Sequence, residues 1–139
     1  MVQIIAGKKG KGKTKFLLEK ANGAVKDAHG TIVYLDKNTK HMYELNNKIR
    51  LIDVFEYPIH SYEAFLGFIC GIISQDHDLE QLYLDSFLKL SNLSGNEIER
   101  AVNDLEHIGK KYGVSFILSV SEDKDSMPEN AQERTIIAL

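Results

Sequence analysis

The feature that most constrains the fold of this chain is a segment rich in glycine and lysine, Gly7 to Thr14, which reads Gly-Lys-Lys-Gly-Lys-Gly-Lys-Thr. The residues before it, Val2 to Ala6, are mostly apolar, as in a short buried strand. After it, helical spacing from Lys13 to Asp27 places four apolar side chains on one face: Phe16, Leu17, Ala21 and Val25. A strand that passes through a glycine-rich turn into a helix predicts the first unit of an α/β fold.

The same segment satisfies the phosphate-loop pattern G-x-x-x-x-G-K-[ST] at every position. Glycines let successive backbone N–H groups point at phosphate oxygens, and the helix N-terminus adds partial positive charge. Lys13 is expected to reach the β- and γ-phosphates of a nucleoside triphosphate, and the Thr14 hydroxyl to hold Mg²⁺. We therefore predict binding of ATP and Mg²⁺, with the base preference left open, by these residues: Gly7, Lys8, Lys9, Gly10, Lys11, Gly12, Lys13, Thr14 and Lys15.

The rest of the chain alternates short apolar runs with longer helical patterns, which is typical of a mostly parallel sheet with helices between its strands. Further strands are expected at Thr31–Leu35, Arg50–Phe55, Gln81–Leu84, Val114–Val120 and Thr135–Leu139. A length of 139 residues accommodates one domain, residues 1–139. The predicted architecture is a three-layer α/β sandwich.

Two helices are predicted in the second half of the chain. One begins at Ser61 and ends near Ser74, with four residues expected on its buried face: Phe65, Ile69, Cys70 and Ile73. The other is capped by Ser94, with Glu97 three residues later as a capping box, and ends at Tyr112 before Gly113.

Residues 36 to 48 allow two interpretations. Asn38 or Thr39 could cap a short helix that turns Met42 and Leu45 inward. Alternatively, the segment could form a hairpin that turns at Asn46-Asn47.

A carboxylate for the metal is expected at the end of another strand. The apolar run Leu82–Leu84 is followed directly by Asp85. Ligands of open α/β sheets bind at the carboxyl ends of the strands, and Mg²⁺ in such sites usually keeps several waters. We therefore predict that Asp85 and Thr14 form the Mg²⁺ site, with Asp85 acting through a bound water.

Beyond the loop, three features resemble the RecA-like branch of P-loop ATPases. Asp85-Ser86 looks like the Asp-Ser pair of that branch. Gly113, followed by Val-Ser-Phe-Ile-Leu-Ser-Val-Ser, looks like its helix end and polar-tipped strand. Asp36, at the end of the second expected strand, occupies the place of its catalytic carboxylate. The resemblance implies a strand order in which the Val114 strand lies between the Val2 and Gln81 strands.

The resemblance also implies catalytic roles. Lys13 would contact phosphate and Asp36 would orient the attacking water. The sensor position is Ser119 or Ser121, and Ser119 would sense the γ-phosphate. The family usually carries glutamate at the position of Asp36, and several members carry glutamine as the sensor, so slow hydrolysis is expected. No arginine finger is assigned, since any of the three arginines could serve: Arg50, Arg100 and Arg134.

Three functions fit these residues. The first is an ATP-binding protein with slow Mg²⁺-dependent hydrolysis that acts as a switch or small motor-type ATPase. The second is a small-metabolite kinase that uses the same loop. The third is a nucleotide-binding scaffold without turnover.

Composition and length set expectations about partners. The formal net charge of −3 argues against a protein built mainly to coat nucleic acid, so the lysines of the loop are interpreted as local attraction for phosphate. A basic patch for nucleic acid is the alternative. We expect a monomer or a weak oligomer, because the chain lacks the terminal extensions through which RecA-like ATPases commonly join neighbours. An unidentified protein or nucleic-acid partner remains open.

The apolar runs and the single cysteine set expectations about the compartment. The longest apolar run, Ala64 to Ile73, is about half of the roughly 20 residues that a membrane span needs, so no membrane association is expected. One cysteine, Cys70, and the lack of a visible targeting segment favour a cytoplasmic protein.

Overall fold

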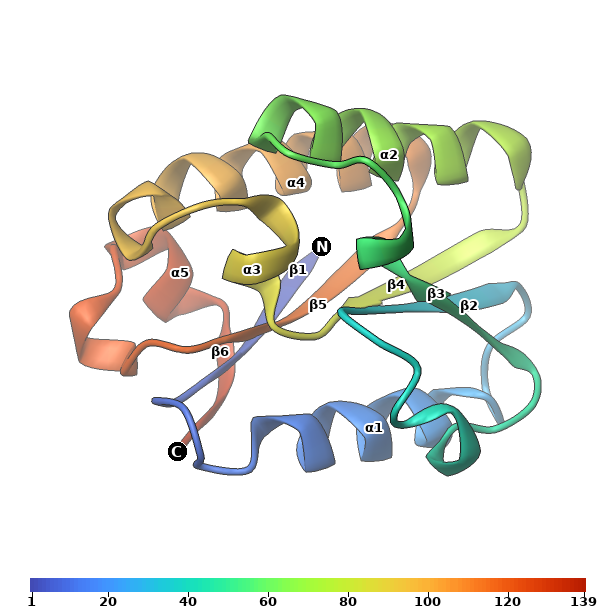
Figure 1. Ribbon diagram of the computed structural model, residues 1–139, viewed down its shortest axis with the longest axis horizontal. Helices are drawn as coiled ribbons and strands as arrows, with labels where there is room; N and C mark the ends of the chain where they lie inside the picture. The colour runs from blue at the N-terminus through green and yellow to red at the C-terminus, as the bar shows by residue number, and fades with distance from the viewer.

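The computed structural model describes residues 1–139 and contains a six-stranded sheet in which every neighbouring pair of strands is parallel. The strands are β1 (Val2–Ala6), β2 (Thr31–Asp36), β3 (Ile49–Asp53), β4 (Leu79–Leu84), β5 (Ser115–Val120) and β6 (Thr135–Ala138). Their order across the sheet is β3-β2-β4-β5-β1-β6 (Figure 1). The strand that follows Gly113 therefore lies between the first strand and the strand that precedes Asp85, as predicted.

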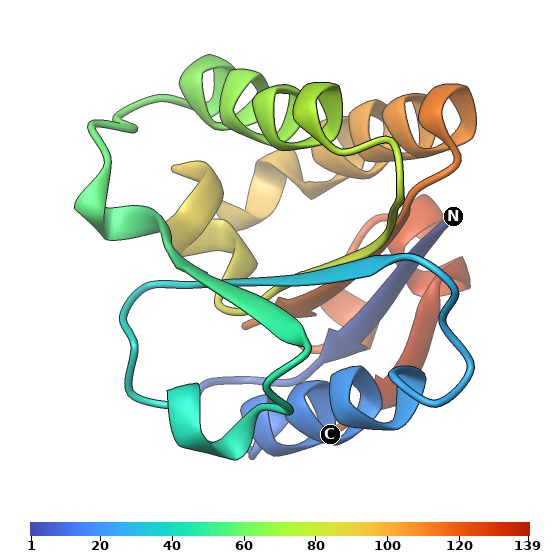
Figure 2. The same ribbon diagram turned by 90° about the vertical axis from the view of Figure 1, so that its right-hand side faces the viewer.

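Helices cover both faces of this sheet, which gives three layers. The α-helices are α1 (Lys13–Ala24), α2 (Tyr62–Gln75), α3 (Phe87–Ser91), α4 (Ile98–Tyr112) and α5 (Glu129–Glu133). Single 3₁₀ turns are η1 (Met42–Glu44), η2 (Val54–Glu56), η3 (Gly95–Glu97) and η4 (Lys124–Ser126). Figures 1 and 2 show α1 and η1 on one face and α2 and α4 on the other.

Each face has its own apolar core. The core under α2 to α5 contains 26 buried residues, and the core under α1 contains 10, so most of the buried apolar surface lies on the α2–α4 side. The two central strands β4 and β5 contribute to both cores, since Leu82 and Phe116 face α2–α4 whereas Tyr83 and Ile117 face α1. Strands buried on both faces have the nearly continuous apolar runs seen in this sequence.

The two longer helices on the larger core begin and end where local signals place them. Ser61 caps α2 by accepting a hydrogen bond from the Ala64 N–H at 3.0 Å. Ser94 and Glu97 form the predicted capping box before α4, and Gly113 ends α4 in the left-handed conformation with φ 70°.

The buried face of α2 differs from the prediction at one position. Cys70 is exposed. The side chains that face the sheet are Tyr62, Phe65, Ile69, Ile72 and Ile73. Cys70 follows Ile69 directly, and one residue is about 100° around a helix, so its side chain lies off this stripe.

The segment between β2 and β3 was open to two interpretations, and both need correction. A hairpin at Asn46-Asn47 is wrong, because β2 and β3 are parallel. A helical turn does form, but only over Met42–Glu44. Leu45 is buried as expected, whereas Met42 is 49% exposed, because a single 3₁₀ turn offers too short a face to bury both side chains.

Other differences involve short elements. Strand β3 ends at Asp53 rather than Phe55, because the Asp53 side chain accepts a hydrogen bond from the Phe55 N–H at 3.0 Å and starts η2. Helix α3 is absent from the prediction, since five residues are too few to show a helical period. No helix of the structure combines the length and apolar character that crossing a bilayer requires.

Candidate functional site

The glycine-rich loop, residues 7–12, connects the end of β1 to the start of α1. Gly10 and Gly12 have φ values of 88° and 91°, in the left-handed region that side chains other than glycine rarely adopt. A Cβ atom at either position would meet no neighbouring atom, so the backbone conformation, not crowding, requires glycine. Gly12 caps α1 without a side chain, which leaves the first N–H groups of the helix facing the loop.

Lys13 is the first residue of α1 and is only 8% exposed. Its Nζ donates a hydrogen bond of 3.2 Å to the Lys8 carbonyl oxygen, across the loop. Burial lowers the pKa of the Lys13 ammonium, and the negative charge of Asp85 opposes that effect. The ammonium is therefore held at the mouth of the loop with no carboxylate in direct contact.

Asp85 follows β4 and is the centre of a hydrogen-bond network at the carboxyl edge of the sheet. Its Oδ1 accepts from Ser119 Oγ at 2.8 Å and from Thr14 Oγ1 at 3.3 Å. Its Oδ2 accepts from the Tyr34 hydroxyl at 2.9 Å. Burial, reinforced by the charge of Asp85, raises the pKa of Tyr34, so the phenol keeps its proton and remains a donor. Side chains from β2, β5 and α1 thus converge on one carboxylate, which follows β4.

Ser86 and Ser119 fix the geometry around that carboxylate. Ser86 has a left-handed backbone with φ 53°, and its N–H points at both Asp85 Oδ1, 2.9 Å away, and Ser119 Oγ, 2.8 Å away. Ser119 lies on β5 and is 1% exposed. A strained non-glycine residue that is held by two hydrogen bonds is a common feature of functional sites.

A cavity of about 620 Å³ lies over the loop and this network. Its lining residues are Lys9, Gly10, Gly12, Lys13, Thr14, Lys37, Lys40, His41, Asp85, Ser86, Leu88, Lys89, Ser119 and Ser121. Five of them are lysines, and Asp85 is the only carboxylate. None of the five lysines takes part in an ion pair. Such a cavity attracts anions, and its volume suits a small-molecule ligand.

The predicted site residues divide between those that line this cavity and those that do not. Those that line it are Lys9, Gly10, Gly12, Lys13, Thr14, Asp85 and Ser119. Those outside its lining are Gly7, Lys8, Lys11, Lys15 and Asp36. The Lys8 ammonium lies 3.6 Å from the Asp123 carboxylate, on the exposed side of the loop.

Asp36 is buried beside the cavity, with 2% of its surface exposed. Its Oδ1 accepts a hydrogen bond of 2.7 Å from the Lys37 N–H, and its Oδ2 has no partner. Burial raises the pKa of Asp36, and the nearby charge of Asp85 adds to the increase. A buried carboxylate oxygen without a donor is costly, so Asp36 is expected to lower the stability of the folded chain when it is ionised.

This cost leads to a prediction about pH. Since folding favours the protonated form of Asp36, its stabilising contribution is complete below the ordinary carboxyl pKa, about 3.9, and is lost as the pH rises through the raised pKa. Asp36→Asn removes the ionisation and keeps the oxygen that accepts from Lys37. We expect this variant to be more stable than the wild type by about 1 kcal/mol at pH 7.5, with no gain at pH 3.5.

Urea unfolding at the two pH values measures this difference. Asp125→Asn, at an exposed position, is the matched control and should match the wild type at both. If Asp36→Asn is no more stable than the wild type at pH 7.5, the prediction is wrong and Asp36 Oδ2 accepts a hydrogen bond in solution.

Several lining residues were missed by the sequence interpretation. Lys37 and Lys40 follow β2, and Lys89 lies on α3. The position of Lys37 directly after Asp36, at the carboxyl end of a strand, is a signal that could have identified it. Tyr34 had no such signal, because an aromatic residue inside an apolar strand is indistinguishable from core.

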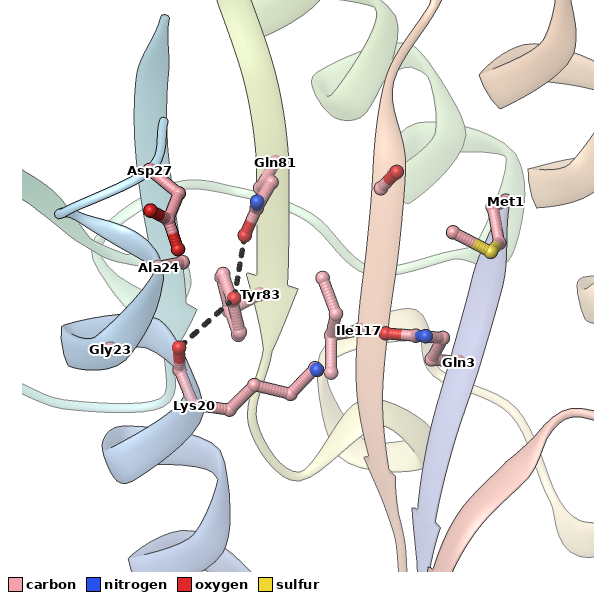
Figure 3. Close-up of a pocket in the computed structure, with 10 residues that line it drawn as sticks. Met1, Gln3, Lys20, Gly23, Ala24, Asp27, Gln81, Tyr83 and Ile117 are labelled. Carbon is pink, nitrogen blue, oxygen red and sulfur yellow. Dashed lines mark hydrogen bonds between the residues drawn. The ribbon is translucent and has the colours of Figure 1, made fainter. Parts of the chain in front are cut away.

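A second, smaller pocket of about 330 Å³ lies at the opposite edge of the sheet, beside the end of α1 (Figure 3). The Tyr83 hydroxyl lies 2.6 Å from Gln81 Oε1 and 3.5 Å from the Lys20 carbonyl oxygen. Burial raises the pKa of Tyr83 to about 12. The Tyr83 ring stacks on Tyr34 with centroids 6.2 Å apart. No phosphate-binding loop borders this pocket.

The structure contains no group of three or more histidine, cysteine, aspartate or glutamate side chains that could enclose a metal ion. Thr14 and Asp85 lie within hydrogen-bond distance of each other, at the start of α1. One hydroxyl and one carboxylate fit Mg²⁺, which retains waters and binds phosphate oxygens, better than a metal that needs a complete protein cage.

The chain matches no protein-family model, and no curated protein matches it.

Proposed function

We propose that this chain binds a nucleoside triphosphate with Mg²⁺ in the 620 Å³ cavity and hydrolyses it slowly, as a minimal RecA-like P-loop ATPase. The observation that carries the proposal is the Thr14–Asp85–Ser119 hydrogen-bond network beside the Lys13 ammonium. The position of β5 between β1 and β4 supports the RecA-like comparison. We propose ATP as the substrate, with GTP as the alternative.

Each residue has a distinct role in this proposal. The free N–H groups at the start of α1 and the Lys13 ammonium bind the phosphates. Thr14 and Asp85 would hold Mg²⁺, which would supply positive charge near the phosphate oxygens. Ser119 fixes the orientation of Asp85 through its 2.8 Å hydrogen bond. Asp36 would orient the attacking water with its unpaired Oδ2.

One observation favours a second function, a scaffold that binds nucleotide without turnover. Asp36 does not line the cavity, so its carboxylate does not face the region where an attacking water would lie. If nucleotide binding leaves Asp36 in this position, the chain has no general base at the site. The kinase alternative gains no support, because no arginine lines the cavity to clamp phosphates during transfer.

Phosphate release from ATP and from GTP tests the proposal. We expect slow release that requires Mg²⁺ and is lost with a chelator. Asp85→Asn should weaken metal affinity or turnover by about 10–100-fold, the usual effect of altering a partner of a metal site. Asp125→Asn, an exposed carboxylate outside the cavity, should leave both unchanged. Mg²⁺-independent release, or equal rates in wild type and Asp85→Asn, would contradict the proposed metal site.

A further inference from the structure

None of the three arginines that could have served as a finger lines the cavity. Arg100 forms an ion pair of 2.7 Å with Glu63, and Arg134 forms one with Glu106, both on the α4 side of the molecule. Arg50 is exposed on β3 and does not line the cavity. No arginine of this chain therefore faces the cavity, and any cation that acts there from the same chain is a lysine or His41.

Lys37 is the best placed of the lysines outside the loop. It follows Asp36 at the end of β2, and its backbone N–H donates to Asp36 Oδ1 at 2.7 Å, which fixes the start of the side chain. Its Nζ donates a hydrogen bond of 3.4 Å to Ser86 Oγ, at the rim of the Asp85 network. The side chain thus reaches from β2 toward the place where β4 ends.

The charges around Lys37 indicate what it would bind. It makes no ion pair, and its positive charge lies close enough to Lys13 to lower the pKa of that residue. Two ammonium groups in one cavity repel each other unless an anion lies between them. The hydrogen bond from Lys37 to the Ser86 hydroxyl is long, and the hydroxyl is neutral. A charged phosphate oxygen would be a stronger acceptor for the Lys37 ammonium.

We propose that Lys37 is a second phosphate-binding cation of this site, which contacts the terminal phosphate of the triphosphate from the β2 end of the cavity and replaces an arginine finger within the same chain. This inference rests on the proposed nucleotide site. A lysine supplies a point charge without the bidentate geometry of arginine, so it stabilises the developing charge less well. The slow turnover expected of this chain is consistent with that difference.

The role of Lys37 predicts selective binding. Only a triphosphate places a phosphate at the β2 end of the cavity, so Lys37→Gln should weaken binding of ATP, or of a non-hydrolysable ATP analogue, and leave ADP affinity unchanged. We expect the ratio of ATP to ADP affinity to fall about 10-fold, the effect of losing one hydrogen bond to a charged group. Lys37→Arg should restore the ratio, since it keeps the charge.

The test is isothermal titration of wild type, Lys37→Gln, Lys37→Arg and Lys48→Gln with Mg·ADP and the analogue. Lys48 is exposed in the same connection between β2 and β3 and lies outside the cavity, so Lys48→Gln should match the wild type. The midpoint of thermal unfolding without nucleotide confirms that each variant is folded. Because binding is the readout, the result does not depend on turnover.

The outcomes separate this inference from the proposed function. A selective loss of ATP affinity in Lys37→Gln, restored in Lys37→Arg, supports it. Equal losses for ADP and ATP, or no loss for either, would overturn the role of Lys37 and leave the nucleotide site in place. A wild type that binds neither nucleotide would overturn both.

Discussion

Mg·ATP is expected to raise the melting temperature of the wild-type chain, and Lys13→Ala is expected to abolish this increase. A ligand at about 100 times its dissociation constant stabilises the folded state by about 2.7 kcal/mol. For a domain of this size, that corresponds to an increase of about 10 °C. Lys13 is 8% exposed and lies at the start of α1, so no other ammonium can take its place in the loop.

The same substitution should do little harm to the empty protein. Burial lowers the pKa of Lys13, which means that folding opposes its charge, and its hydrogen bond closes a loop rather than supporting a core. Thermal unfolding of wild type, Lys13→Ala and Lys26→Ala, with and without Mg·ATP, measures both effects. Lys26 is exposed and outside the cavity, so its variant should keep the full increase. A wild type that does not respond to saturating nucleotide would refute the nucleotide site.

Asp36→Asn is expected to lower turnover by about 10²–10⁴-fold while leaving the affinity for ATP nearly intact. This is the usual cost of removing a positioned general base. The raised pKa of Asp36 brings the carboxylate closer to the range of an effective base, and its buried Oδ2 has no partner, so it could accept from a water that reaches it when nucleotide binds. Since Asp36 would act only as the transition state forms, binding should not depend on it.

Asp85→Asn is expected to differ from Asp36→Asn in its effect on binding. In the proposed site, Asp85 would contribute to metal binding before reaction, so its variant should lose both binding and rate. Single-turnover phosphate release at matched occupancy measures the rates. Equal rates in wild type and Asp36→Asn would assign Asp36 the structural role of holding the Lys37 N–H. Tight binding with no release in either protein would favour the scaffold.

The sheet and the loop were predictable because their signals are local. Short apolar runs, a capping box at Ser94 and a glycine after Tyr112 each act over a few residues. The capping box and the glycine appear where predicted, and the six strands form at the apolar runs with ends that differ by up to two residues. Asp85 was predictable for the same reason, since it follows an apolar strand whose carboxyl end must lie at the ligand-binding edge.

The predictions that were wrong or missing concern features that depend on tertiary contacts, not on local signals. Whether Cys70 faces the core depends on how α2 is rotated against the sheet, and periodicity alone allowed either side of Ile69. Helix α3 is stabilised by burial of Phe87 and Leu90, which only the folded chain provides. The exposure of Met42 likewise depends on how η1 lies beside α1.

The sequence by itself determined an α/β chain with a glycine-rich loop between a strand and a helix, because side-chain periodicity and the φ values that glycine allows are local properties. Only the tertiary structure determined which polar and charged side chains lie in contact with one another. The parallel order of β2, β4, β5 and β1 brings Tyr34, Asp85, Ser119 and Thr14 into one network. The same order brings Lys37 to Ser86 at the end of β4, whereas Arg100 and Arg134 are paired with Glu63 and Glu106, since strands far apart in sequence become neighbours only when their apolar faces are buried together.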